Sequence, residues 1–348
     1  MYKALSLIAL GVLVISCSKT QEEKNKLFPI DFSAIKGQYT AGETLPLTVS
    51  NPEKQQIDSV VYYLSNKKVG SVKGNEKLSV PLNNVKLGYQ DIKATTYYPD
   101  GYGESSGRIE IISGVKAKIL SYEIVNTYPH DVTSYTQGLE FYRDTLVEGT
   151  GQYGQSVLRK EDYKTGEAYK KVSLDGKYFG EGITIFNNKI YQLTWKENTG
   201  FIYNADNLNK IKDFNYAKAI QGWGLTHDDK YLYQSDGSEK IYKLDPETLQ
   251  EVDYINVYAG DRKIKELNEL EYVNGKLYAN VYQTNGIMVI DPATGAVEGI
   301  LNMAELETKI NKTPQTNVLN GIAYNPKTGT FFITGKLWDK MFEVRIKE

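Results

Sequence analysis

The sequence predicts an all-β protein in which an immunoglobulin-like β-sandwich precedes a five-bladed β-propeller. Three observations support this fold class. The 348 residues include 28 tyrosines, and aromatic residues favour strands because they suit a pleated, half-buried surface. Short alternating runs separated by turn residues fill the chain from residue 27 to residue 114. From residue 137 onward a motif recurs about every 45 residues, an interval typical of propeller blades.

The chain begins with a segment typical of a bacterial lipoprotein signal peptide. Lys3 precedes an apolar run over residues 4–15, which is too short to span a bilayer comfortably. The letters VISC resemble a lipobox and end in Cys17, the only cysteine, so residues 1–17 are predicted to be a signal whose cysteine is lipidated. This predicts a lipid-anchored protein of the cell envelope, on the periplasmic face or the outer membrane surface. An ordinary signal peptide with a stray cysteine is the alternative.

The next two segments are predicted to be a tether and the sandwich. Residues 18–26, SKTQEEKNK, are polar and charged, as expected of a flexible tether. Residues 27–114 contain about seven short alternating runs, such as DSVVYYLS and YQDIKATTYY, divided by turns such as YPDGYG. Since this region has no cluster of reactive side chains, we interpret it as a spacer or packing module.

The repeats occupy residues 115–348, the predicted propeller. Five segments begin with a polar or aromatic residue, usually followed by glycine and an aliphatic residue: QGLEF at Gln137, EGITI at Glu181, WGLTH at Trp223, NELEY at Asn268 and NGIAY at Asn320. Each is followed by a second strand, and most by a third and a fourth. The fifth repeat ends without a fourth strand. We therefore expect the run AKILSYEIVNTYP, before the first repeat, to complete it and close the ring.

The repeat register predicts a binding site. Innermost strands of a propeller line a central channel, so the first residues of the five repeats should meet at one mouth of this channel. Three residues at the ends of second strands, Trp195, Tyr282 and Lys336, should lie at the same mouth. Aromatic walls with a few polar groups are typical of a small-ligand site. Burial among indoles should raise the pKa of Glu181 toward the range useful for proton transfer.

Composition excludes several function classes. With 41 basic and 43 acidic residues, the net charge of −2 offers no basic field for nucleic acid. Only His130 and His227 are present, and Cys17 is assigned to lipidation, so a zinc site built on several imidazoles is excluded and a Ser-His-Asp hydrolase is poorly supported. No metal ligand is predicted and no cofactor is expected for catalysis, although a structural cation in the channel stays open.

Long blocks of the repeat region resemble the plant and bacterial type of glutaminyl-peptide cyclotransferase. The blocks include YPHDVTSYTQGLEF, YFGEGITIFNNKIYQLTW, GWGLTHDDKYLYQSDGS and LNELEYVNGKLYANVYQT, and the resemblance covers about residues 119–344. It implies a five-bladed propeller that converts the N-terminal glutamine of a peptide or protein into pyroglutamate and releases ammonia without a catalytic metal.

The resemblance also implies roles for particular residues. The glutamate of the Phe-Gly-Glu-Gly motif, here Glu181, would be the acid/base, and the substrate pocket would include Gln137, Trp195, Trp223, Asn268 and Lys336. Tyr282 stands where this family usually has tryptophan, which makes that wall smaller and adds a hydroxyl. The effect of this difference on substrate preference stays open.

The residues fit this chemistry, and two other functions stay open. One carboxylate could move a proton from the attacking amine to the departing nitrogen, while Lys336 or Asn268 stabilises the oxyanion. One alternative is a non-catalytic propeller that binds peptide N-termini or small ligands such as sugars at the cell envelope. The other is a lactonase or lyase with a channel-bound calcium. That would require several acids at the strand starts, where only Glu181 is acidic.

Overall fold

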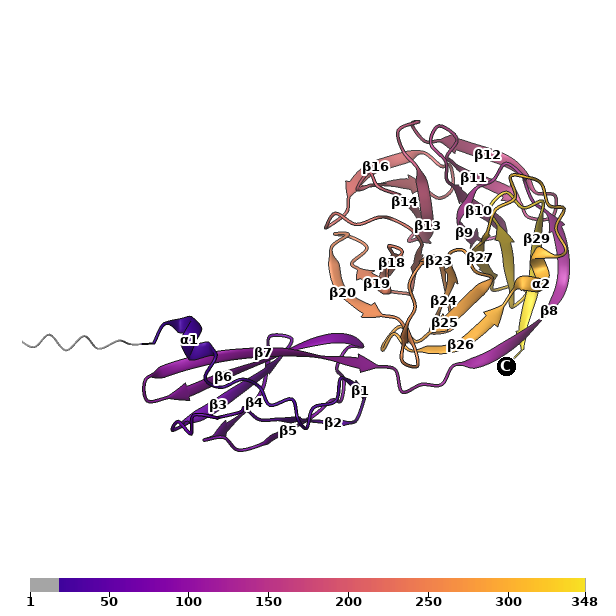
Figure 1. Cartoon of the computed structure of the whole chain (residues 1–348). Coiled ribbons are helices and arrows are strands. Elements are labelled where there is room, and N and C mark those ends of the chain that lie inside the picture. The colour runs from indigo at the N-terminus through magenta and orange to yellow at the C-terminus, as the bar shows by residue number, and fades with distance from the viewer. Residues whose placement is uncertain (1–18, 348) are drawn as a thin grey trace, which may run out of the picture. The chain divides into compact units, whose positions relative to one another are not determined.

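The computed structural model describes residues 19–347, which form two compact units (Figure 1). The first unit comprises residues 19–83 and 89–110, and the second comprises residues 84–88 and 111–347. Cys17 and the predicted signal over residues 1–17 lie outside the described residues. Within residues 19–347 no helix is long and apolar enough to cross a membrane.

The first unit contains seven strands in two sheets. The larger sheet has the order β1-β7-β6-β3-β4, and β2 pairs with β5 in the smaller one. Strand β3 shows why these segments form strands, since Val60, Tyr62 and Leu64 alternate inward and are buried. The bounds are β1 (Gln38–Thr40), β2 (Thr44–Leu47), β3 (Ser59–Leu64), β4 (Lys67–Lys73), β5 (Leu78–Pro81), β6 (Gly88–Tyr98) and β7 (Gly101–Ile112).

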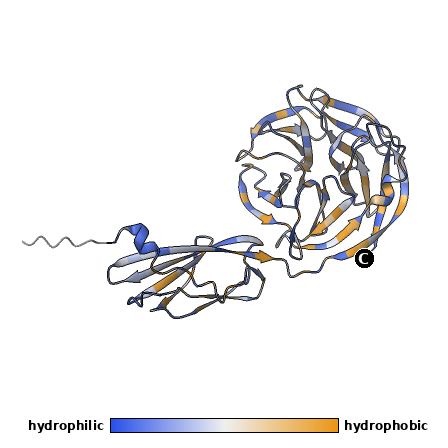
Figure 2. Ribbon diagram, in the orientation of Figure 1, coloured by the Kyte–Doolittle hydropathy of each residue, from blue (hydrophilic) through white to orange (hydrophobic). Residues whose placement is uncertain are grey.

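The structure differs from the predicted tether over residues 18–26. Residues Gln21–Asn25 form a short hydrophilic helix, α1 (Figure 2), with a capping box between Thr20 and Glu23. Asn25 Oδ1 accepts a hydrogen bond of 2.8 Å from the backbone N–H of Glu104. The prediction of a flexible tether is therefore wrong for α1, because its cap and its contact with β7 hold a polar segment that has no apolar face.

The second unit is a propeller-like ring of sheets (Figure 1). Three sheets have four strands each: β9 (Thr136–Tyr142) to β12 (Glu167–Ser173), β13 (Gly180–Phe186) to β16 (Lys210–Asn215), and β17 (Leu225–His227) to β20 (Glu251–Asn256). A fourth sheet has eight strands in the order β23-β24-β25-β26-β8-β29-β28-β27.

The remaining bounds are β8 (Lys118–Pro129), β10 (Thr145–Thr150), β11 (Val157–Asp162), β14 (Lys189–Thr194), β15 (Thr199–Asn204), β18 (Leu232–Ser235), β19 (Lys240–Leu244), β21 (Tyr258–Ala259), β22 (Arg262–Lys263), β23 (Leu267–Val273), β24 (Lys276–Val281), β25 (Gly286–Ile290), β26 (Val297–Asn302), α2 (Ala304–Glu307), β27 (Leu319–Asn325), β28 (Thr330–Gly335) and β29 (Lys340–Lys347). Apolar cores lie between neighbouring sheets, as where Val147 and Leu158 of one sheet pack with Ile183 and Phe201 of the next.

Strand β8 joins the two ends of this unit, as the sequence predicts. It pairs antiparallel with β29 from Pro129↔Lys340 to Ser121↔Lys347. Its first residues, Lys118 to Leu120, pair in parallel with Gly299 to Leu301 of β26. The strand before the first repeat therefore completes the sheet of the last repeat and leaves no open edge between them.

The glycine found near the start of four of the five repeats is required by the close approach of the innermost strands. A Cβ added to Gly182 would lie 2.5 Å from the backbone oxygen of Trp223 and 2.6 Å from the backbone nitrogen of Leu225. The fourth repeat has Glu269 at this position. Its carboxylate accepts hydrogen bonds from the backbone N–H groups of Leu139 (3.2 Å) and Ile322 (2.9 Å) and so ties three innermost strands together.

Candidate active site

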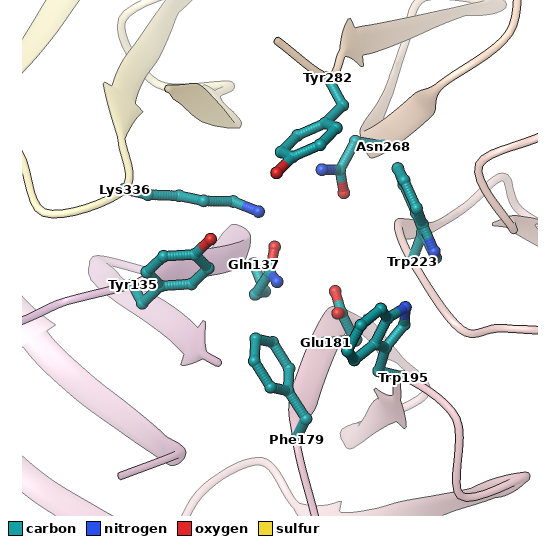
Figure 3. A pocket seen from close by; sticks show the side chains of 9 residues that line it. All are labelled: Tyr135, Gln137, Phe179, Glu181, Trp195, Trp223, Asn268, Tyr282 and Lys336. Atoms are coloured by element: carbon teal, nitrogen blue, oxygen red, sulfur yellow. The ribbon is translucent and has the colours of Figure 1, made fainter. Parts of the chain in front are cut away.

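Seven of the eight predicted pocket residues meet in one cavity. Its volume is about 290 Å³, and Figure 3 shows its side chains converging on a common space. The lining consists of Tyr135, Gln137, Phe179, Glu181, Trp195, Trp223, Asn268, Tyr282 and Lys336.

The positions of these residues follow the repeat register. One group lies at or just before the start of an innermost strand: Gln137 on β9, Glu181 on β13, Trp223 before β17 and Asn268 on β23. The other group directly follows a second strand: Trp195 after β14, Tyr282 after β24 and Lys336 after β28. The cavity thus forms where adjacent strand ends of several sheets meet, as the sequence predicts.

The structure differs from the sequence prediction at Asn320. Its side chain is fully buried and does not line the cavity. The Asn320 Nδ2 group donates hydrogen bonds to the backbone oxygen of Thr136 (2.9 Å) and to Gln137 Oε1 (3.3 Å). Asn320 therefore lies behind Gln137 and supports it, because neighbouring innermost strands approach closely enough for one amide to reach the next strand.

Two lining residues, Tyr135 and Phe179, were missed by the sequence prediction. Each lies two residues before a predicted site residue, Gln137 or Glu181, and both residues of each pair face the cavity (Figure 3). Tyr135 and Phe179 directly precede β9 and β13. An extended chain places residues i and i+2 on the same face, so this spacing was a usable signal.

Glu181 is a buried carboxyl group without a protein partner. It is 4% exposed, and it makes no hydrogen bond or ion pair with another residue in the described part of the chain. Burial raises the pKa of Glu181 well above its usual value, while the Lys336 cation opposes this rise. A carboxyl group held in this way is suited to exchanging a proton with a bound ligand.

Lys336 lies across the cavity from Glu181 (Figure 3). It is 3% exposed, and its Nζ lies 4.7 Å from the ring centre of Tyr135 and 5.2 Å from that of Tyr282. Burial lowers the pKa of Lys336 to about 8, against the influence of the Glu181 carboxylate. The two aromatic faces thus hold an ammonium group that interacts favourably with their π-systems.

The other cavity groups are aromatic rings and amides. The rings of Phe179 and Trp195 are 5.6 Å apart, and those of Trp223 and Tyr282 meet edge to face at 5.7 Å. Asn268 Oδ1 is buried and has no hydrogen-bond partner among residues 19–347. The cavity therefore combines apolar walls with free hydrogen-bonding groups, an arrangement that fits one compact polar ligand.

Further buried glutamates on the innermost strands were not recognised from the sequence. Glu140 Oε2 accepts a hydrogen bond from the backbone N–H of Ile185 (3.0 Å), and Glu271 Oε1 accepts one from that of Tyr324 (2.8 Å). Like Glu269, they connect neighbouring innermost strands. In the described residues, no group of three or more His, Cys, Asp or Glu side chains is arranged to hold a metal ion.

Comparisons with known proteins give matches over most of the chain. The family described as glutamine cyclotransferase matches residues 103–346. A glutaminyl-peptide cyclotransferase of Arabidopsis thaliana is 38% identical over 252 residues, which cover 72% of this chain and 78% of the relative. The crystal structure of Myxococcus xanthus glutaminyl cyclase is similar with a TM-score of 0.62 and 32% identity, covering 67% of this chain and 99% of that one.

Proposed function

This chain belongs to the glutamine cyclotransferase family, and on that premise we infer that it converts the N-terminal glutamine of peptides or proteins into pyroglutamate. The α-amine attacks the carboxamide carbon of the same residue, the ring C–N bond forms, and ammonia leaves. The feature of the site that best supports this reaction is the buried, unpartnered Glu181 facing Lys336 across a cavity of about 290 Å³.

We propose that Glu181 moves one proton during the reaction. When the neutral α-amine attacks, its nitrogen becomes positively charged, and Glu181 as a carboxylate accepts one proton from it. As a carboxylic acid it then gives this proton to the carboxamide nitrogen, so that the C–N bond breaks and neutral ammonia departs. The raised pKa of Glu181 favours the first step, because it makes the carboxylate a stronger base than an ordinary glutamate, and the carboxylic acid can then return the proton.

We propose that the other cavity residues stabilise and orient the reacting glutamine. Lys336 and the amide of Asn268 face the cavity and can stabilise the negative charge that develops on the carboxamide oxygen. Trp195, Trp223, Phe179 and Tyr282 surround the side chain and keep it folded toward its own amine, which converts the attack into a near-attack geometry.

We also propose five blades for the ring and an immunoglobulin-like fold for the first unit. Three four-stranded sheets are separate, and the eight-stranded sheet divides into two blades at the short parallel pairing between β26 and β8. In the first unit, seven strands in sheets of five and two support the sandwich prediction.

Two further features of the protein are proposals from the sequence. Lipidation of Cys17 would hold the enzyme at the bacterial cell envelope, with peptides or proteins bearing N-terminal glutamine as its partners. We propose that the protein's own side chains suffice for catalysis and that no metal cofactor takes part.

A direct assay tests the reaction and the metal proposal. The protein without residues 1–17 is incubated with a glutamine-initiated peptide, and ammonia release is measured with and without a chelator. We expect the same amount of ammonia to be released with and without the chelator. We also expect the product peptide to have no free α-amine left to react. Release that stops with chelator would contradict metal independence. Binding of the peptide without any ammonia release would favour a non-catalytic propeller.

A further inference from the structure

One side chain beside the cavity contacts both indole walls. Gln221 Oε1 accepts hydrogen bonds from Trp195 Nε1 (2.6 Å) and from Trp223 Nε1 (2.9 Å). Gln221 itself is exposed and does not line the cavity. A single amide oxygen therefore bridges two aromatic residues that come from different sheets.

The backbone around Gln221 is fixed by the end of strand β14. The N–H of Gly222 donates to the backbone oxygen of Trp195 (3.0 Å). The hydroxyl of Tyr216 donates to the backbone oxygen of Thr194 (2.7 Å). The connection from β16 to β17 is thus tied at two points to the residues that carry Trp195, which holds the Gln221 amide in place despite its exposure.

Apart from their shared hydrogen bonds to Gln221, the indole rings of Trp195 and Trp223 contact different neighbours. Trp195 packs on Phe179 and lies under the Lys196 cation, whose Nζ is 3.6 Å from its ring centre. Trp223 packs on Tyr282 and against Gly237, where an added Cβ would lie 2.7 Å from its ring. In the described residues, no ring contact or hydrogen bond joins the two indole rings directly, and Gln221 is the side chain that accepts hydrogen bonds from both.

We propose that Gln221 is a positioning residue that sets the distance and tilt between the two indole walls. This rests on the proposed cyclisation, in which the indoles keep the glutamine side chain folded. Fixed indole walls restrict the side chain of the substrate glutamine to conformers in which its α-amine and its carboxamide carbon lie close together. A loss of this restriction lowers the rate of ring closure. The role needs only the acceptor oxygen of Gln221.

The test compares Gln221→Leu, which removes the acceptor, with Gln221→Glu, which keeps it. For Gln221→Leu we expect kcat on a glutamine-initiated peptide to fall about tenfold, as two lost hydrogen bonds of ordinary strength would produce, with a smaller change in KM. The near-UV circular dichroism of the indoles should change as well. Gln221→Glu should keep kcat, at its own optimal pH, within about threefold of the wild type.

Gln155→Leu is the matched control, because Gln155 is exposed and its side chain makes no hydrogen bond within residues 19–347. Gln155→Leu and Gln221→Glu should unfold within about 2 °C of the wild type, whereas Gln221→Leu, which loses two hydrogen bonds, should unfold a few degrees lower. Unchanged kcat in Gln221→Leu, or equal losses in Gln221→Leu and Gln221→Glu, would overturn the proposal. An inactive wild type would instead refute the cyclisation, and the indole spectrum would still report whether Gln221 orders the tryptophans.

Discussion

Burial acts in opposite directions on the two ionisable side chains of the cavity. It raises the pKa of Glu181 well above its usual value and lowers that of Lys336 to about 8, since in both cases it disfavours the charged form. Each group counteracts the shift of the other. The cavity therefore holds a carboxylate that is a stronger base, and an ammonium group that is a stronger acid, than the same side chains are in water.

Glu181→Gln should remove the proton carrier and keep the shape of the cavity. We expect kcat/KM to fall about 10³-fold, within the range that general acid–base catalysis contributes. The measurement is ammonia release from a glutamine-initiated peptide, and binding of an uncyclisable peptide should persist as a control. Activity near that of the wild type would rule out Glu181 as the proton carrier.

The same substitution should stabilise the protein at neutral pH. The pKa of Glu181 is higher in the folded state than in the unfolded state, so the unfolded state releases this proton first and is favoured as pH rises above about 4.5. An amide avoids this cost. We expect the melting temperature of Glu181→Gln to exceed that of the wild type at pH 8 and to match it at pH 4. A lower value at pH 8 would contradict a buried, unpartnered carboxyl group.

Substitutions at Lys336 should change both limbs of the pH profile. Lys336→Met should lower kcat about 10²-fold through loss of oxyanion stabilisation. It should also move the acidic limb to higher pH, because the Lys336 cation lowers the pKa of Glu181. In the wild type, activity should decline above pH 8 as Lys336 loses its charge, whereas Lys336→Arg should remain charged and lose that decline. Profiles with the same limbs in all three proteins would exclude this role.

At the scale of elements, the site depends on how closely the innermost strands pack. The N–H of Gly182 donates to the backbone oxygen of Trp223 (2.7 Å), which links the strand of Glu181 directly to the residue that forms the next wall. A side chain at this position would push the two strands apart. The recurring glycine is therefore part of the geometry of the site and also of the fold.

Gly182→Ala should lower both stability and activity. Because its Cβ would meet backbone atoms that cannot move aside, we expect a loss of about 2 kcal/mol in unfolding free energy and at least about a tenfold loss in kcat/KM. Urea unfolding and ammonia release measure the two effects. Gly176→Ala is the control, since the nearest atom to its Cβ would be Gly154 Cα at 3.6 Å, an ordinary contact. Equal behaviour of the two variants would contradict the steric argument.

At the scale of the whole second unit, two contrasting sets of carboxyl groups have shifted pKa values. Glu148 and Asp131 are paired with the buried Arg159, and both have pKa values lowered to about 2. Burial instead raises the pKa of a second set, which includes Glu140, Glu269 and Glu271 on the innermost strands and also Glu161, whose pKa rises to about 7 although it pairs with Arg159. The two sets make stability depend on pH in opposite senses.

This unit should be most stable at about pH 5. The lowered pKa values contribute stability that is present above the unfolded values of 4.5 and 3.8 and is lost as pH falls toward 2. The raised values favour unfolding as pH rises above 4.5, because the folded state retains protons that the unfolded state releases. Tryptophan fluorescence during heating reports this unit alone, since Trp195, Trp223 and Trp338 all belong to it. A melting temperature that rises steadily from pH 5 to pH 8 would contradict this expectation.

Local patterns in the sequence were sufficient to predict the strands, the closing strand and most of the residues that line the cavity. Alternation and turn residues mark each strand locally, and a repeat of similar length brings equivalent positions to the same place in a ring. Gln137, Glu181 and Lys336 could be assigned for this reason, although they lie far apart in the chain. The capping box of Thr20 and Glu23 was an equally local signal for α1, and it was overlooked.

The contacts of individual side chains, in contrast, could be known only from the folded chain. The position of Asn320 behind Gln137 depends on the distance between strands of different sheets. The same holds for the hydrogen bond that the Glu269 carboxylate accepts from the backbone N–H of Ile322. The same is true of the Gln221 bridge between Trp195 and Trp223. Periodicity fixes the face on which a residue lies, but the partner across the ring is set by how the sheets pack around the axis, which no local pattern in the sequence records.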